Sequence, residues 1–113
     1  MILDDAKALA DKLRDSEEYR AYRDAKARAY ASKPTATLLD EFQKLRMKAQ
    51  AASVAGEPDK EAAEKLQKLG ELLQFDENAA AFLMAEYRLN ALIGDIYRLL
   101  AEAVDLDLGA LEA

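Results

Sequence analysis

Apolar residues recur along most of the chain at intervals of three and four, the spacing that places side chains on one face of an α-helix. The pattern is interrupted where proline, glycine or a helix-capping residue occurs. The expected helical segments cover residues 3–13, 17–30, 34–54, 59–73 and 77–103. We therefore expect an all-α fold, a bundle of about five helices in which the shorter helices pack on a long C-terminal helix.

The residues at the breaks suit helix ends. Ser16 precedes two glutamates and fits an N-cap, whose side-chain oxygen accepts a backbone N–H, and Asp76 takes the same place before the last segment. Pro34 fits the start of the third segment, where a missing N–H leaves no hydrogen bond unmade. Gly56 suits the C-cap of the third segment, and Pro58 suits the beginning of the next helix. Residues 55–59 are therefore the clearest predicted turn.

The last predicted helix is the longest and most apolar, and it has two adjacent rows of apolar side chains. A stripe of this width cannot be covered by one antiparallel neighbour, so we expect self-association, as a homodimer or a larger oligomer, through this helix. The alternative is that the second row belongs to the chain's own core. The expected interface residues are Phe82, Leu83, Glu86, Leu89, Leu92, Ile93, Ile96, Tyr97 and Leu100.

The composition excludes several classes of function. The 113 residues include no cysteine and no histidine. Disulfides, thiol catalysis and the commonest general base and transition-metal ligand are therefore excluded. The chain also has no glycine-rich phosphate loop and no EF-hand loop. We expect a protein that is not an enzyme and that needs no cofactor or metal.

Charge and hydropathy indicate where the chain acts and what it binds. Residues 1–56 carry 11 Lys/Arg and 9 Asp/Glu, whereas residues 57–113 carry 5 and 13. A general nucleic-acid binder needs a net basic face, so direct RNA binding through the N-terminal half remains only an alternative. The N-terminal residues are too charged for a signal peptide, and no stretch reaches the roughly 18 apolar residues of a membrane span. We expect a cytoplasmic protein with other proteins as partners and no membrane association.

Three tyrosines and one charged pair are candidates for a partner surface. Tyr19, Tyr22 and Tyr30 form either an exposed aromatic strip or a row packed against the third predicted helix. Glu86 and Arg88 lie in an otherwise apolar stretch. Glu86 is either a ligand or a partner contact, or a charge at the edge of the bundle that is paired with Arg88 or with a neighbour across the interface. A buried Glu86 must be paired, because an isolated buried charge costs several kcal/mol.

Three stretches resemble the YlbF/YmcA/YheA family of small helical regulators of Gram-positive bacteria. They are DSEEY at residues 15–19, LLDEFQKL at residues 38–45 and FLMAEYRLNALIGDI at residues 82–96. The family has similar junction, leucine–acid–Phe and Ala-Glu-x-Arg helices in the same order, and the likeness covers roughly residues 2–103. We accordingly expect one domain over residues 1–104, followed by an acidic tail over residues 105–113.

The resemblance implies an oligomerising helical bundle and a non-enzymatic regulator of competence, sporulation and biofilm formation. Some family members act in a complex that modulates ribonuclease Y and messenger-RNA processing. The chain departs from the family in two respects. Asp76-Glu77 stands where Asn-Pro is frequent, and the cysteines that some members contribute to an iron–sulfur-carrying complex are absent. A purely structural homo-oligomer without a regulatory partner is the remaining alternative.

Overall fold

The computed structural model describes residues 1–106, which form five α-helices and no strand. The helices are α1 (Ile2–Arg14), α2 (Glu17–Tyr30), α3 (Lys33–Val54), α4 (Lys60–Leu73) and α5 (Glu77–Ala103). All five predicted segments are confirmed, with their boundaries correct to within one residue. Most of the expected acidic tail, residues 107–113, lies outside the described residues.

The helix ends follow from the residues at the breaks. The Ser16 side chain accepts a hydrogen bond from the Tyr19 N–H at 3.2 Å, as an N-cap should. Asp59 caps α4 in the same way. Pro34 stands in the first turn of α3. Gly56 has a φ of +79°, the left-handed conformation that ends many helices and that glycine adopts without strain.

Asp76 both caps α5 and joins it to α3. Its Oδ1 accepts the backbone N–H groups of Asn78 and Ala79, and its Oδ2 accepts the Thr35 hydroxyl at 2.6 Å. Thr35 is buried, so this bond fixes the start of α3 against the start of α5. The hydrogen bond from Thr35, followed by the N–H of Ala79, lowers the pKa of the Asp76 carboxyl, because both stabilise the charged form.

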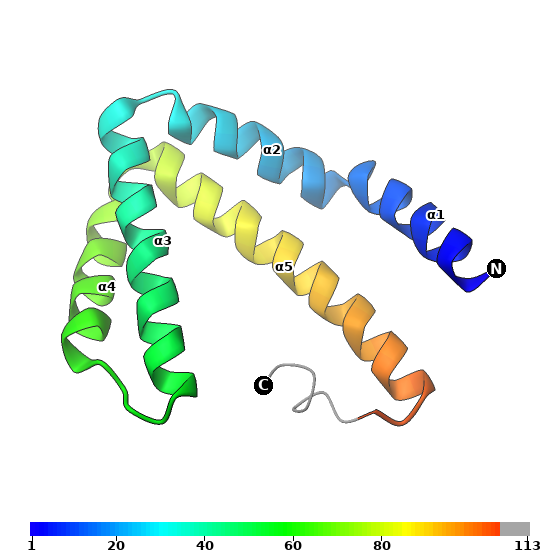
Figure 1. The fold of residues 1–113 in the computed structure, drawn as a ribbon. Helices are drawn as coiled ribbons and strands as arrows, with labels where there is room; N and C mark the ends of the chain where they lie inside the picture. Colours follow the sequence, from blue (N-terminus) through cyan, green and yellow to red (C-terminus); the bar gives the residue numbers. More distant parts are fainter. Residues whose placement is uncertain (107–113) are drawn as a thin grey trace.

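The helices form two pairs that meet at one end (Figure 1). α2 packs along the first part of α5, and α3 packs along α4 as a hairpin. α1 continues the line of α2 and lies well apart from the C-terminal end of α5 (Figure 1). The expectation that all the shorter helices pack on α5 was therefore wrong in detail. α4 instead covers α3, because the 55–59 turn folds these two helices directly against each other.

The core lies where the two pairs meet. Phe82, Leu39 and Leu73 are the largest fully buried side chains, and each contributes about 1.5–3 kcal/mol by leaving water. The Phe82 ring lies 5.6 Å from the Tyr22 ring and 5.8 Å from the Tyr30 ring, edge-on to the latter. Small buried residues on both helices let α2 and α5 approach closely: Ala25, Ala29, Ala79 and Ala85.

The molecule is flat and open for its size. Its dimensions are 46 × 36 × 16 Å, and its radius of gyration is 16.8 Å, against about 13 Å for a compact domain of this length. Its accessible surface is 8857 Å², against roughly 6,200 Å² for a compact monomer of this mass. Much apolar surface is therefore not covered by the chain itself. No helix within residues 1–106 has the length and apolarity needed to cross a bilayer.

Candidate functional site

An open groove of about 900 Å³ lies between α4 and α5. It exists because α4 packs on α3 rather than on α5, so the two helices leave facing apolar side chains uncovered. We call it the α4–α5 groove. Its lining residues are Phe42, Ala63, Leu66, Gln67, Gly70, Glu71, Gln74, Ala80, Leu83, Met84 and Tyr87.

The lining of the α4–α5 groove is suited to an apolar protein segment. Phe42 reaches it from α3, past Gly70, where an added Cβ would lie 3.3 Å from the Phe42 ring. The absence of a side chain at Gly70 thus makes room for the ring. Met84 and Tyr87 are exposed along its α5 side, and Glu71 is the one charged lining residue. Methionine adapts to irregular surfaces and tyrosine is frequent at interfaces, so the groove has the chemistry of a binding surface.

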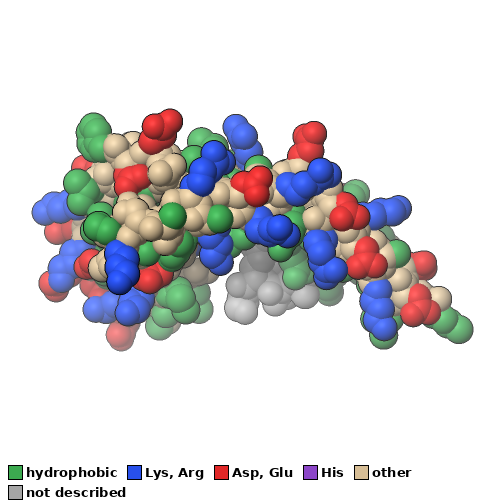
Figure 2. Space-filling model, turned by 90° about the horizontal axis from the view of Figure 1, so that it is seen from above, with side chains coloured by type: hydrophobic (Ala, Val, Ile, Leu, Met, Phe, Trp, Pro, Cys, Tyr) green, Lys and Arg blue, Asp and Glu red, His purple; other side chains and the backbone are tan. Residues whose placement is uncertain are grey.

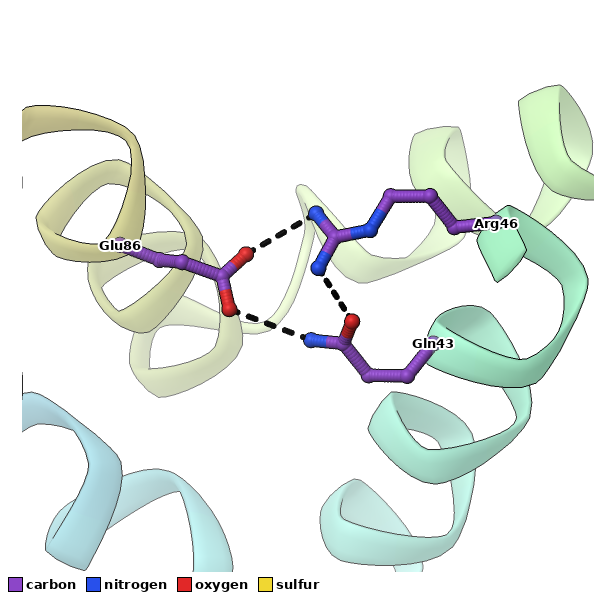
Figure 3. A network of polar contacts seen from close by, with 3 residues as sticks. All are labelled: Gln43, Arg46 and Glu86. Atoms are coloured by element: carbon purple, nitrogen blue, oxygen red, sulfur yellow. Dashed lines mark hydrogen bonds and ion pairs between the residues drawn. The ribbon is translucent and has the colours of Figure 1, made fainter. Parts of the chain in front are cut away.

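A polar network fixes α3 against α5 beside this groove (Figure 3). The Arg46 guanidinium donates to Glu86 Oε1 at 2.9 Å, and the Gln43 amide donates to Glu86 Oε2 at 3.3 Å. Arg46 also donates to Oε1 of the Gln43 side-chain amide. The Glu86 side chain is 15% exposed and that of Arg46 is 41% exposed. The carboxylate is therefore held by two donors at the junction that sets the angle between α3 and α5.

This network corrects the expected pairing of Glu86. The inference that a buried Glu86 must be paired is confirmed, but its partners are Arg46 and Gln43 of the same chain. Arg88 is exposed on α5 and is not its partner. Gln43 and Arg46 are three residues apart on α3, on one helix face. That spacing is the sequence signal, although it does not tell which helix the pair faces.

The tyrosines pack inside the chain rather than forming an exposed strip. Tyr22 and Tyr30 lie against Phe82 of α5, in a core cluster that also contains Leu39 of α3, the helix that the packing interpretation expected. The Tyr30 hydroxyl does reach α3, where it donates to Asp40 Oδ1 at 3.2 Å. Burial, followed by the negative charge of Asp40, raises the pKa of Tyr30. Tyr19 is partly buried, with its ring 6.5 Å from that of Tyr22.

The residues expected at an oligomer interface divide into three groups along α5. Phe82 and Leu89 are buried in the chain's own core, so for them the core interpretation holds and the interface assignment is corrected. Leu83 lines the α4–α5 groove, and Glu86 belongs to the network with α3. The remaining residues lie further along α5, where three of them are half-buried and Tyr97 and Leu100 are exposed. We call them the distal face of α5: Leu92, Ile93, Ile96, Tyr97 and Leu100.

Charged side chains of both signs are mixed along α1 and α2. Figure 2 shows Lys and Arg interspersed with Asp and Glu on the face formed by these helices, without a continuous basic area. This arrangement does not favour the phosphate contacts that RNA binding needs. Within residues 1–106, no three His, Cys, Asp or Glu side chains gather closely enough to hold a metal ion.

Comparison with known proteins identifies the relatives of this chain. The model of the Com_YlbF family, described as "Control of competence regulator ComK, YlbF/YmcA", matches residues 2–105. A UPF0342 protein of Symbiobacterium thermophilum is 35% identical, with 93% of this chain and 95% of that protein covered. A UPF0342 protein of Staphylococcus epidermidis is 30% identical, with 92% of each covered.

A solved structure shares the fold. The crystal structure of Bacillus subtilis RicA in complex with RicF matches with a TM-score of 0.61 at 20% identity, covering 92% of this chain and 93% of that one. The family match spans all five helices, and the relatives match over nearly their whole length. The chain therefore belongs to the Com_YlbF family.

Proposed function

We propose that this protein is a non-enzymatic regulatory adaptor that acts in the cytoplasm by binding other proteins. The observation that carries the proposal is the α4–α5 groove, an uncovered apolar surface flanked by exposed Met84 and Tyr87. Exposed apolar patches of this kind mark interaction surfaces in soluble proteins. The family description names a regulator of competence, and the RicA structure contains a second protein, RicF, which supports the same class of function.

The mechanism we propose is occupancy. The adaptor presents the α4–α5 groove to an amphipathic helix of a partner and so alters the partner's assembly or activity. The partner's apolar side chains fill the groove, and a lysine or arginine beside them pairs with Glu71. The processes expected from the family resemblance are competence, sporulation, biofilm formation and ribonuclease Y-dependent processing of messenger RNA.

Self-association belongs to the same proposal. The distal face of α5 is the oligomer interface, because the chain leaves Tyr97 and Leu100 exposed and covers its other three residues only in part. The groove and the distal face lie on different parts of the molecule, so an oligomer leaves the groove free for another protein. Light scattering over a concentration series measures the oligomer directly.

Substitutions in the groove test the adaptor proposal. Tagged wild-type chain, Met84→Glu and Tyr87→Glu are used to recover partners from the native host, and each recovered partner is then purified and titrated. Both positions are exposed, so the charge does not enter the core. Arg23→Glu, exposed on α2, is the matched control. We expect the groove variants to lose the partner and the control to keep it.

Three outcomes would contradict the proposal. Equal affinity of a purified partner for the wild type and for both groove variants would remove the groove from the mechanism. Salt-sensitive binding of mixed RNA, abolished by Arg23→Glu, would instead support the RNA-binding alternative. An oligomer that recovers no partner would favour the purely structural alternative.

A further inference from the structure

We propose that α1 of each copy packs on the distal face of α5 of a second copy, so that α1 and α5 of two copies form an intermolecular four-helix bundle. The inference rests on the proposed self-association and names the segment of the second copy that covers α5. It gives the apolar face of α1 a partner, which its own chain does not supply.

The first argument is that α1 is amphipathic but has no buried residue. Ile2, Ala6, Leu9 and Leu13 follow the 4-3-4 spacing of one helix face. Ile2 is 85% exposed and Leu9 is 41% exposed. An isolated helix of this length is marginal in water, and most helices are stabilised by packing of their apolar face. α1 contacts its own chain chiefly through α2, so its apolar face needs another cover.

The second argument is that the distal face of α5 also has apolar side chains that its own chain does not fully cover. Its Leu100 is 59% exposed, and Leu99 and Val104 beside it are also exposed. α1 has 13 residues and spans about 20 Å, the length of α5 between residues 92 and 104. α1 of the same chain does not fill this role, because it lies away from the end of α5 (Figure 1).

The third argument is the amount of uncovered surface. The chain exposes roughly 2,700 Å² more than a compact monomer of its mass. A standard stable interface buries about 800 Å² on each partner, and obligate dimers bury more. In a two-fold dimer the contact between α1 and α5 occurs twice. Contact between the two α5 helices alone would leave both α1 faces exposed.

Disulfide trapping tests the contact itself, because a chain without cysteine acquires only the thiols that are introduced. Tagged Leu9→Cys chain is mixed with untagged Leu100→Cys chain, re-equilibrated under reducing conditions and then oxidised. Each position lies near the middle of its segment, so the two meet for either relative direction of the helices. We expect a covalent heterodimer in preference to either homodimer. A Lys7→Cys chain, with its thiol about 160° around α1 from Leu9, is the control and should form no crosslink to Leu100→Cys.

A charge substitution gives an independent readout. Leu9→Asp adds a charge to the apolar face of α1 outside the chain's own core, so helix content should be retained. The dimer dissociation constant should rise by about 100-fold or more, because two such charges would be buried in each dimer. Lys7→Asp, on the opposite side of α1 from Leu9, should leave it nearly unchanged. Light scattering distinguishes the 12.5 kDa chain from a species of twice that mass.

The outcomes separate this inference from the proposed function. A wild-type dimer that gives no Leu9–Leu100 crosslink and resists Leu9→Asp would overturn the role of α1 and leave self-association intact. In a chain that carries both Leu9→Cys and Leu100→Cys, formation of the disulfide within one chain, with no covalent dimer, would also overturn it. A wild type that stays monomeric at every concentration would overturn self-association and this inference together, without touching the α4–α5 groove.

Discussion

Neutralising Glu86 is expected to weaken the link between α3 and α5. Glu86→Gln keeps the size of the side chain but removes its charge and replaces one acceptor oxygen by an NH₂ group. Gln43 and Arg46 both donate to the present carboxylate, at 3.3 and 2.9 Å. The amide can accept from only one of them on its oxygen, so one donor loses its partner at a partly buried position.

The magnitude follows from the exposure of the two charges. Hydrogen bonds to charged groups contribute about 1.5–3 kcal/mol when buried, and exposed ion pairs about 0.2–1 kcal/mol. Glu86 is largely buried, but Arg46 is 41% exposed, so solvent screens the pair substantially. We expect about 1 kcal/mol of coupling between Glu86 and Arg46. The full cost of Glu86→Gln should be about 1–2 kcal/mol, since Gln43 is affected as well.

A double-mutant cycle with Arg46→Met measures this coupling. Methionine retains part of the aliphatic stem beside Phe42, whose ring the guanidinium approaches at 5.7 Å. Urea denaturation followed by circular dichroism, at one chain concentration for all variants, gives the four free energies of unfolding. Asp95→Asn, which breaks an exposed pair on α5, is the control and should change stability by less than about 0.5 kcal/mol.

The result that refutes the reasoning is a coupling within the error of additivity, below about 0.3 kcal/mol. The network would then be a surface contact without influence on the angle between α3 and α5. A coupling near 1 kcal/mol should also appear as a difference of about 4 °C in Tm. If the network shapes the α4–α5 groove, Glu86→Gln should in addition weaken binding of a groove partner that does not touch Glu86.

Three further predictions concern the core, the glycines and pH. Phe82→Ala should destabilise the chain by about 3–5 kcal/mol, because a ring that is 2% exposed leaves a cavity between α2 and α5; a loss below about 1 kcal/mol in urea denaturation would contradict this packing. Gly56→Ala should destabilise the chain by about 1 kcal/mol, because alanine is strained at a φ of +79°. Gly94→Ala should stabilise it by about 0.5–1 kcal/mol, because Gly94 lies in mid-helix with free space around the new Cβ. If thermal unfolding showed that both variants shift the stability in the same direction, these roles of the two glycines would be contradicted. The lowered pKa of Asp76 means that its stabilising effect is complete above the ordinary carboxyl value of 3.8 and is lost as pH falls through the lower folded value. Thr35→Val should raise the pKa of Asp76 towards 3.8 in an NMR titration, and an unchanged pKa would exclude the hydroxyl as the cause.

The sequence by itself determined the elements of this protein. The five helices and their ends depend on local interactions: the periodicity of apolar residues, the Ser16 and Asp76 caps and the positive φ available to Gly56. These interactions reach no further than about four residues, so they can be recognised without knowing the fold. The need for Glu86 to be paired was also predictable, because it follows from the cost of burying a charge.

Only the tertiary structure decided which faces meet. Periodicity shows that a helix has an apolar face but not which neighbour covers it, and an apolar side chain packs equally well against many surfaces. Periodicity therefore places Phe82 at an oligomer interface, although Tyr22 and Tyr30 of the same chain pack against it. It leaves the partner of Glu86 open between Arg88 and a residue across the interface, whereas the partner is Arg46 on α3. The only sequence signal of the α4–α5 groove was the second apolar row of α5, to which Leu83 belongs, because the groove itself arises from two helices that do not pack on each other. Such a surface depends on the relative placement of whole helices, which local patterns do not encode.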